Sequence, residues 1–240
     1  QVNKIARSDN KGVFYLATDA GLAYTTAYLN DSVGSFQKWK MPYGSFPVSN
    51  LSEIYTTVAI DPSDSLHVIA GFIMNGKVRG FSVSITGPTG FKLVIPPGIS
   101  KELKITDISF VSSNLIFATT TGDELDSLGI GGSIWRSTNG GDLWTNVSPS
   151  GFSSGNTIAV GYGITDTVIY VGTGSGSIDT GYIWKSTDMG FTWTKVNSGP
   201  KCAFDSTIIG LPILDIAVDP RGTDTLYIAC GDETEINVDY

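Results

Sequence analysis

The sequence predicts an all-β protein: a β-propeller, or part of one, made of four-stranded antiparallel blades. Short apolar segments recur along the chain, and their starts lie 53, 50, 50 and 58 residues apart, which suits a propeller blade. β-Branched and aromatic residues fill short runs between turns rich in Gly, Ser and Asp. Long stretches with the apolar periodicity of a helix are missing. We therefore expect a single propeller region over residues 1–240.

Each repeat opens with two strands joined by a turn. The first strands contain segments 5–7, 58–60, 108–110, 158–160 and 216–218. The second strands follow at 14–18, 67–71, 115–119, 168–173 and 226–230. Turn signals separate them, such as Asp-Pro-Ser-Asp at 61–64 and Asp-Pro-Arg-Gly at 219–222.

A third and a fourth strand complete the first four repeats. The third strands are predicted at 21–26, 77–83, 132–138 and 182–187, and the fourth at 36–41, 91–95, 143–147 and 192–196. The blades then span about 3–41, 55–96, 105–148, 157–197 and 213–240, the fifth being incomplete. A sheet cut after its second or third strand has an open edge. We expect the chain to be part of a longer protein, or to be completed by a further chain or further blades.

Two connections between third and fourth strands carry a sharper pattern, 49 residues apart: 137–144 reads Ser-Thr-Asn-Gly-Gly-Asp-Leu-Trp, and 186–193 reads Ser-Thr-Asp-Met-Gly-Phe-Thr-Trp. Asp or Asn accepts hydrogen bonds from nearby backbone N–H groups, Gly takes a positive φ, and Trp buries a large ring. We expect buried Trp residues here and at Trp39, the corresponding site of the first repeat.

Both segments resemble the Asp-box, S-x-D-x-G-x-T-W; Asn139 and Leu143 are the departures in the first copy. The chain thus resembles Asp-box (BNR-type) repeat proteins such as sialidases, xyloglucanases and sortilin-type receptors, and in style the secreted bacterial repeat proteins. The resemblance implies a secreted or cell-surface location, in a bacterium. It also implies a structural role for the motif residues Ser137, Asn139, Gly141, Trp144, Ser186, Asp188, Gly190 and Trp193.

The opposite end of the strands is where we expect a ligand. Antiparallel strands alternate in direction, so the connections between second and third strands all lie at that end. The candidate ligand-binding residues are the carboxylates of these connections: Asp19, Asp123, Glu124, Asp179, Asp232 and Glu233. Clustered carboxylates suit sugar hydroxyls, a calcium ion or acid/base chemistry, and the alternative is solvated loop residues. Because no calcium-loop spacing is present, we expect no cofactor, with calcium as a secondary option.

One of these carboxylates carries a further resemblance. Residues 18–24, Thr-Asp-Ala-Gly-Leu-Ala-Tyr, resemble the T-D-x-G-G-A-Y segment of xyloglucanases, in which the Asp is catalytic. This makes Asp19 a candidate catalytic residue, although Leu22 replaces the second Gly and Thr25 stands where Arg is usual. Inverting hydrolysis needs two carboxyl groups, and the partner acid of that family lies in a second propeller. We therefore commit to no catalytic residue.

The expected function is an extracellular propeller module for binding a glycan or a protein, or for structural assembly. The alternative is a fragment of a xyloglucanase-like glycoside hydrolase acting on β-glucans. A catalytic triad is excluded, because the single histidine, His67, has no Ser or Cys signal paired with it. The net charge of −8 argues against nucleic acid, and no 18-residue apolar stretch predicts a membrane span.

Two cysteines, Cys202 and Cys230, leave two interpretations open. They form a disulfide if the protein is exported, or they are two small buried apolar residues. Two thiols with one distant histidine make a poor zinc site.

Overall fold

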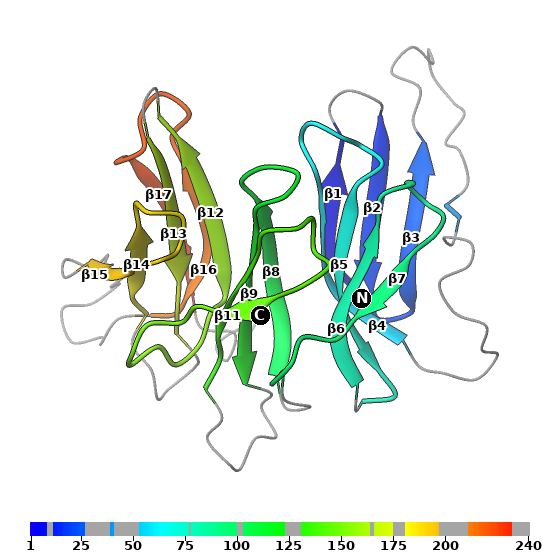
Figure 1. Cartoon of the computed structure of the whole chain (residues 1–240), viewed down its shortest axis with the longest axis horizontal. Coiled ribbons are helices and arrows are strands. Elements are labelled where there is room, and N and C mark those ends of the chain that lie inside the picture. The colour runs from blue at the N-terminus through cyan, green and yellow to red at the C-terminus, as the bar shows by residue number, and fades with distance from the viewer. Residues whose placement is uncertain are drawn as a thin grey trace, which may run out of the picture.

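The computed structural model describes residues 1–8, 12–26, 39–40, 53–76, 78–99, 103–122, 131–163, 166–174, 181–196 and 211–231. Within these ranges the chain forms strands and turns but no helix, and so no helix that could cross a membrane. The strands make five antiparallel sheets that stand side by side in chain order (Figure 1).

The first sheet contains β1 (Val2–Arg7), β2 (Val13–Thr18) and β3 (Gly21–Thr26), and Lys40 forms a bridge to Tyr24 at its edge. The second contains β4 (Glu53–Ile60), β5 (Val68–Met74), β6 (Val78–Ser84) and β7 (Lys92–Val94). The third contains β8 (Leu103–Phe110), β9 (Ile116–Gly122), β10 (Ile134–Ser137) and β11 (Thr145–Asn146). The fourth contains β12 (Thr157–Tyr162), β13 (Thr167–Gly172), β14 (Ile183–Ser186) and β15 (Thr194–Val196). The fifth contains β16 (Ile213–Val218) and β17 (Leu226–Cys230).

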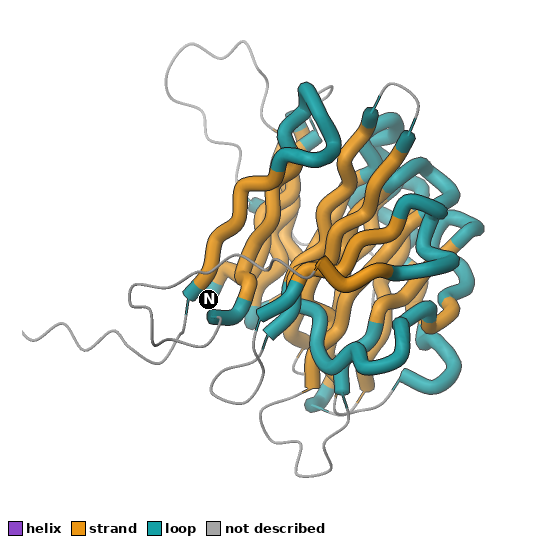
Figure 2. The backbone as a smooth tube through the Cα atoms, turned by 90° about the vertical axis from the view of Figure 1, so that its left-hand side faces the viewer, coloured by secondary structure: helices purple, strands orange, loops and turns teal. Residues whose placement is uncertain are grey.

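Every sheet follows the chain order from one edge to the other. The first strand of each sheet is therefore an edge strand, and these five strands, β1, β4, β8, β12 and β16, contact one another from sheet to sheet. We call this row of edges the axial edge. The strands of successive sheets run in similar directions, with the turns gathered at their two ends (Figure 2). This arrangement confirms the predicted all-β architecture of a partial propeller.

A hydrophobic core fills each of the four seams between consecutive sheets. Every seam is built from one equivalent pair: a large side chain on the second strand of one sheet and an aliphatic side chain on the first strand of the next. All eight side chains of these pairs are at most 6% exposed. The pairs are Tyr15 with Val58, Ile69 with Ile108, Phe117 with Ile158, and Tyr170 with Ile216.

The two turns with the S-x-[DN]-x-G pattern adopt one hydrogen-bonded conformation. In the fourth sheet the Ser186 hydroxyl accepts the N–H of Gly190 at 2.8 Å, and the Asp188 carboxylate accepts the N–H of Thr192 at 2.9 Å. The Thr192 hydroxyl also donates to Asp188, at 2.6 Å. These donors favour the ionised carboxylate and lower the pKa of Asp188 to about 2.

The corresponding turn of the third sheet repeats these bonds with a neutral side chain. The Ser137 hydroxyl accepts the N–H of Gly141 at 2.9 Å, and the Asn139 side-chain oxygen accepts the N–H of Leu143 at 2.9 Å. Gly141 and Gly190 have φ values of 91° and 79°, a region that only glycine enters freely. The shared pattern therefore reflects one turn geometry, as the sequence predicts.

The tryptophans bury themselves against the preceding sheet. Trp144 is 4% exposed and stacks on Phe81 at 4.0 Å between ring centroids, and Trp193 meets Phe117 edge-on at 6.2 Å. The prediction that Trp39 is buried in the same way is wrong, because its side chain is 49% exposed. The first sheet has neither the motif turn nor, in the described residues, a preceding sheet on which Trp39 could pack.

Candidate functional site

The turns divide between two ends of the strands, as expected. Turns between first and second strands lie at the upper end in Figure 1. The turns between third and fourth strands share this end, because Gly140 donates its N–H to Asn114 and its carbonyl lies 3.0 Å from Nε2 of His67. The connections between second and third strands emerge at the opposite, lower end. Asp19 lies at this lower end, directly after β2.

Asp19 is an exposed carboxylate with a fixed orientation. The side-chain amide of Asn3, on β1, donates to its Oδ1 at 2.9 Å and also to the carbonyl of Tyr55, on β4, at 2.8 Å. An amide nitrogen has two protons, so it can make both bonds at once. The bond from Asn3 lowers the pKa of Asp19. The predicted residue is thus an ionised acceptor that the first two sheets hold in place.

The other predicted ligand residues, Asp123, Glu124, Asp179, Asp232 and Glu233, lie outside the described residues. Their clustering around Asp19 stays a prediction.

A second polar group, which we did not predict, runs along the axial edge. Each first strand places a polar residue directly before its aligned apolar residue, and we call this set the axial polar row: Lys4, Thr57, Asp107, Thr157 and Asp215. In four of the five first strands the pairing register shifts beside this residue. A β-bulge re-aims the side chain that follows it, so the same local irregularity recurs where the row needs it.

Asp107 is the centre of the row. Its side chain is 8% exposed and accepts from the Lys4 ammonium at 3.2 Å, from the Ile158 N–H at 3.1 Å and from the Ile108 N–H at 3.0 Å. Lys4 belongs to the first sheet and Ile158 to the fourth, so one carboxylate ties distant sheets to the third. Because its acceptor sites are occupied by donors, we assign Asp107 a structural role.

Asp215 ends the row as an exposed carboxylate. It accepts the N–H of Ile216 at 2.9 Å, and the Thr157 hydroxyl lies 3.3 Å from it and 3.2 Å from Asp107. That hydroxyl has one proton, so it donates to one of the two carboxylates at a time. The lower half of the axial edge therefore displays two exposed, oriented carboxylates, Asp19 and Asp215.

Residues one position before the row link the sheets through the backbone. Asn3 donates to the Tyr55 carbonyl, Thr106 donates to the Gly155 carbonyl at 2.5 Å, and Asn156 donates to the Ile213 carbonyl at 3.1 Å. In each case the acceptor is the same position on the first strand of the following sheet. We call these three bonds the inter-sheet clasps. Aligning the residues that precede the apolar segments would have revealed both the clasps and the row.

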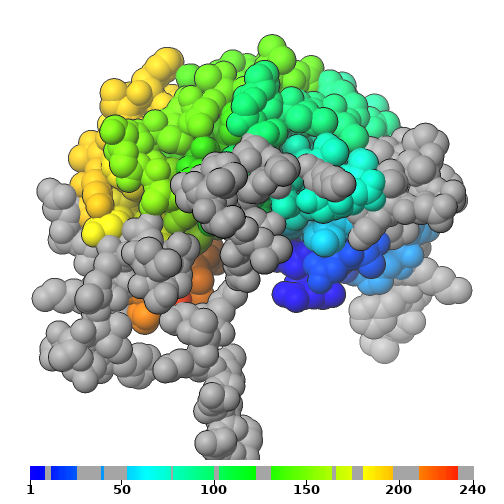
Figure 3. Space-filling model, turned by 90° about the horizontal axis from the view of Figure 1, so that it is seen from below, coloured from blue at the N-terminus to red at the C-terminus, as the bar shows by residue number. Residues whose placement is uncertain are grey.

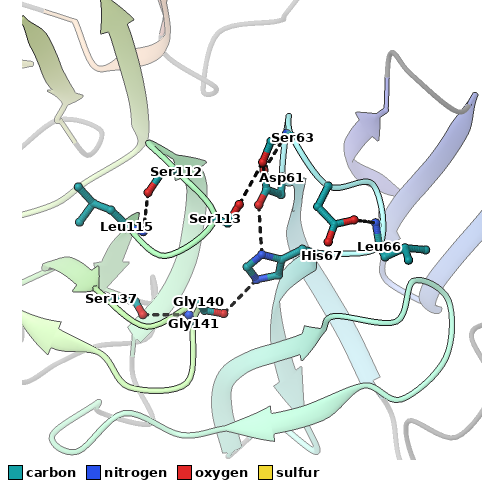
Figure 4. Close-up of polar contacts among 11 residues, drawn as sticks. Asp61, Ser63, Leu66, His67, Ser112, Ser113, Leu115, Ser137, Gly140 and Gly141 are labelled. Atoms are coloured by element: carbon teal, nitrogen blue, oxygen red, sulfur yellow. Dashed lines mark hydrogen bonds and ion pairs between the residues drawn. The ribbon is translucent and has the colours of Figure 1, made fainter.

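His67 forms a buried cluster at the upper end (Figure 4). Its Nδ1 lies 3.3 Å from Oδ2 of Asp61, and its Nε2 faces the Gly140 carbonyl of the third sheet. Its ring also meets Phe110 edge-on at 5.0 Å. Ser63 donates to Asp61 through both its N–H and its hydroxyl. Burial alone would raise the pKa of Asp61, but bonds from Ser113, Ser63 and His67 lower it.

This cluster joins two sheets and has no catalytic geometry. A triad histidine needs its second nitrogen facing a nucleophile, whereas here that nitrogen faces a backbone carbonyl. The sequence had no signal for the Asp61 pairing beyond the spacing of six residues.

Among the described residues, no group of three or more His, Cys, Asp or Glu side chains is placed to hold a metal ion. Cys230, on β17, is disulfide-bonded. Cys202 lies outside the described residues, so the Cys202–Cys230 pairing stays a prediction.

No protein-family model matches the chain, and no curated protein sequence does. Solved structures do match. A GH74 enzyme from Niastella koreensis superposes with a TM-score of 0.59 at 19% identity, covering 96% of this chain and 33% of that one. The GH74 xyloglucanase from Xanthomonas campestris gives 0.62 at 14% identity, with 95% and 35% covered. A β-propeller domain from Myceliophteria thermophila gives 0.54 at 9% identity, with 96% and 66% covered.

These likenesses show the fold: a β-propeller architecture. The chain spans about a third of the length of the two GH74 structures. At these identities the superpositions do not carry the activity of those enzymes over to this chain.

Proposed function

We propose that this chain is the part of an Asp-box β-propeller that binds a glycan at the lower end of the axial edge. The observation that carries the proposal is the pair of exposed carboxylates, Asp19 and Asp215, each oriented by a neighbouring N–H donor. Carbohydrate hydroxyls are hydrogen-bond donors, and a carboxylate fixed before binding loses little side-chain entropy when it accepts them. Negative charge at this end disfavours phosphate groups as ligands.

The Asp-box assignment supports the proposal. The turns around Asn139 and Asp188 have the hydrogen bonds and positive-φ glycines that the motif requires. They lie at the upper end, so the motif leaves the lower end free for a ligand. A secreted or cell-surface location belongs to the same proposal, because the disulfide bond of Cys230 suits an oxidising compartment.

Binding is tested with a glycan array that includes xyloglucan and other β-glucan oligosaccharides, followed by calorimetric titration of the best ligand. We expect Asp19→Asn to weaken binding about tenfold or more, since hydrogen bonds to charged groups contribute roughly 1.5–3 kcal/mol. Asp224→Asn is the matched control: it removes the same charge from the turn between β16 and β17, at the other end. Silence across the array would contradict glycan binding and make a protein ligand the next hypothesis.

A second candidate function is hydrolysis of β-glucans, which one observation favours. The bond from Asn3 keeps Asp19 ionised at neutral pH, as a general base or a nucleophile must be. Release of reducing ends from xyloglucan by the wild type, abolished in Asp19→Ala, would establish this activity. An inert wild type would exclude it for this chain.

A further inference from the structure

The two outermost sheets leave uncovered the same side chains that the inner sheets bury. The apolar residue aligned on the first strands is 2% exposed at Val58 and 6%, 5% and 6% exposed at Ile108, Ile158 and Ile216. Its counterpart on β1, Ile5, is 60% exposed. Val2, on the same strand, is 53% exposed. The first sheet therefore presents, without a partner among the described residues, the surface that the other four sheets pack against a neighbour.

The fifth sheet shows the complementary surface. The large residue on the second strand is at most 3% exposed at Tyr15, Ile69, Phe117 and Tyr170. The corresponding residue of β17, Tyr227, which pairs with Ala217, is 59% exposed. Leu214, on β16, is 44% exposed. One open face thus has the aliphatic half of a seam, and the other has the aromatic half.

The fourth seam shows how the two halves fit. Tyr170 packs against Ile216, and its hydroxyl donates to the Thr223 carbonyl, in the turn between β16 and β17, at 2.8 Å. Tyr227 has the same residue type at the same position. An Ile5 face set against it would bury an Ile–Tyr pair of the kind that this chain already uses.

Charge along the axial polar row agrees with the same pairing. The row runs from a cation, Lys4 on the first sheet, to an anion, Asp215 on the fifth. Another first sheet placed beside the fifth would bring a lysine next to Asp215, extending the row with opposite charges in contact. Within one molecule these two sheets lie at different sides: Figure 3 shows the first in blue and the fifth in orange, apart from each other.

We infer that these faces join two copies of this chain head to tail, the Tyr227 face of one copy covering the Ile5 face of the next. The occupant of each open face is thus a second copy. The contact is heterologous, so it closes into a ring or grows into a chain of copies, depending on the rotation between them. It is distinct from the proposed glycan site, and either proposal can fail without the other.

Sedimentation equilibrium and light scattering on the 240-residue chain test the inference. The wild type should associate in a concentration-dependent manner. Ile5→Asp alone and Tyr227→Asp alone should each remain monomeric, because each variant lacks one half of the contact. An equimolar mixture should form a 1:1 dimer that does not grow further, since one Tyr227 face and one Ile5 face remain intact.

Ile85→Asp is the matched control, because it places the same charge at another exposed apolar side chain and should associate like the wild type. Unfolding curves verify that the variants fold, and Ile5→Ser with Tyr227→Ser is the milder pair if an aspartate disturbs its strand. A wild type that stays monomeric up to high concentration would overturn the inference and would leave these faces to further blades or another protein. A mixture that remains monomeric while the wild type associates would overturn the head-to-tail geometry.

Discussion

The tightest turns of the fold should be sensitive to a single methyl group, and Gly190→Ala is the sharpest case. Gly190 has a φ of 79°, and an added Cβ would lie 2.5 Å from Cε1 of Phe117. Phe117 is fully buried on the second strand of the preceding sheet, where it fills the third seam. The methyl group therefore meets two obstacles: an unfavourable backbone conformation and a ring that cannot move aside freely.

The two costs can be separated by a second glycine. Gly76 has a similar φ of 64°, but a Cβ there would meet nothing within 4 Å. Gly76→Ala should therefore cost only the left-handed conformation, about 1–2 kcal/mol. Gly190→Ala should cost that amount and an additional overpacking penalty of about 1–3 kcal/mol.

Denaturant titrations and thermal melts of the wild type and both variants measure this difference. For a chain of this size, each kcal/mol lowers Tm by about 2–4 °C, so Gly190→Ala should melt several degrees below Gly76→Ala. Equal destabilisation of the two variants would show that the seam yields at no cost. The glycine of the motif would then be needed only for its φ.

Three further predictions concern other contacts of the fold. The pKa of Asp188 is lowered from 3.8 to about 2 in the folded state, so its stabilising contribution should be complete above pH 4 and disappear as the pH falls toward 2; thermal melts of Asp188→Asn should differ from wild type at neutral pH and converge with it in acid. His67→Phe should reduce the free energy of unfolding by about 1–3 kcal/mol in denaturant titrations, because it leaves Asp61 and the Gly140 carbonyl without their buried partner, whereas Leu66→Ala beside it, at an exposed side chain, should have a small effect. Cys230→Ser should cost about 2–4 kcal/mol, and a reductant should lower the Tm of the wild type while leaving that of the variant unchanged.

The repeat made the architecture predictable from the sequence. The aligned apolar segments, such as 58–60 and 158–160, lie in first strands, and Asn139 and Asp188 occupy turns with the same hydrogen bonds. These features follow from local chemistry: strand propensity, turn residues and glycine at positive φ. A pattern of this kind is visible in one chain because the chain presents it several times.

The long-range polar contacts were not predictable in the same way. Lys4 meets Asp107 because a bulge and two intervening seams bring their strands together, and no local rule fixes that pairing. The partner of His67 at Gly140 lies 73 residues away and depends on how two sheets dock. Trp39 shows the converse: its position in the repeat predicted burial, yet burial also needs a neighbouring sheet.

The inter-sheet clasps bear on how such a chain can change over evolutionary time. In each clasp a side chain of one sheet reaches a main-chain carbonyl of the next, and every residue type offers that carbonyl. The receiving position is Tyr in one sheet, Gly in another and Ile in a third. A whole blade could therefore be duplicated, exchanged or left to drift in sequence without a compensating change in its neighbour, and gene duplication alone would suffice to lengthen the protein.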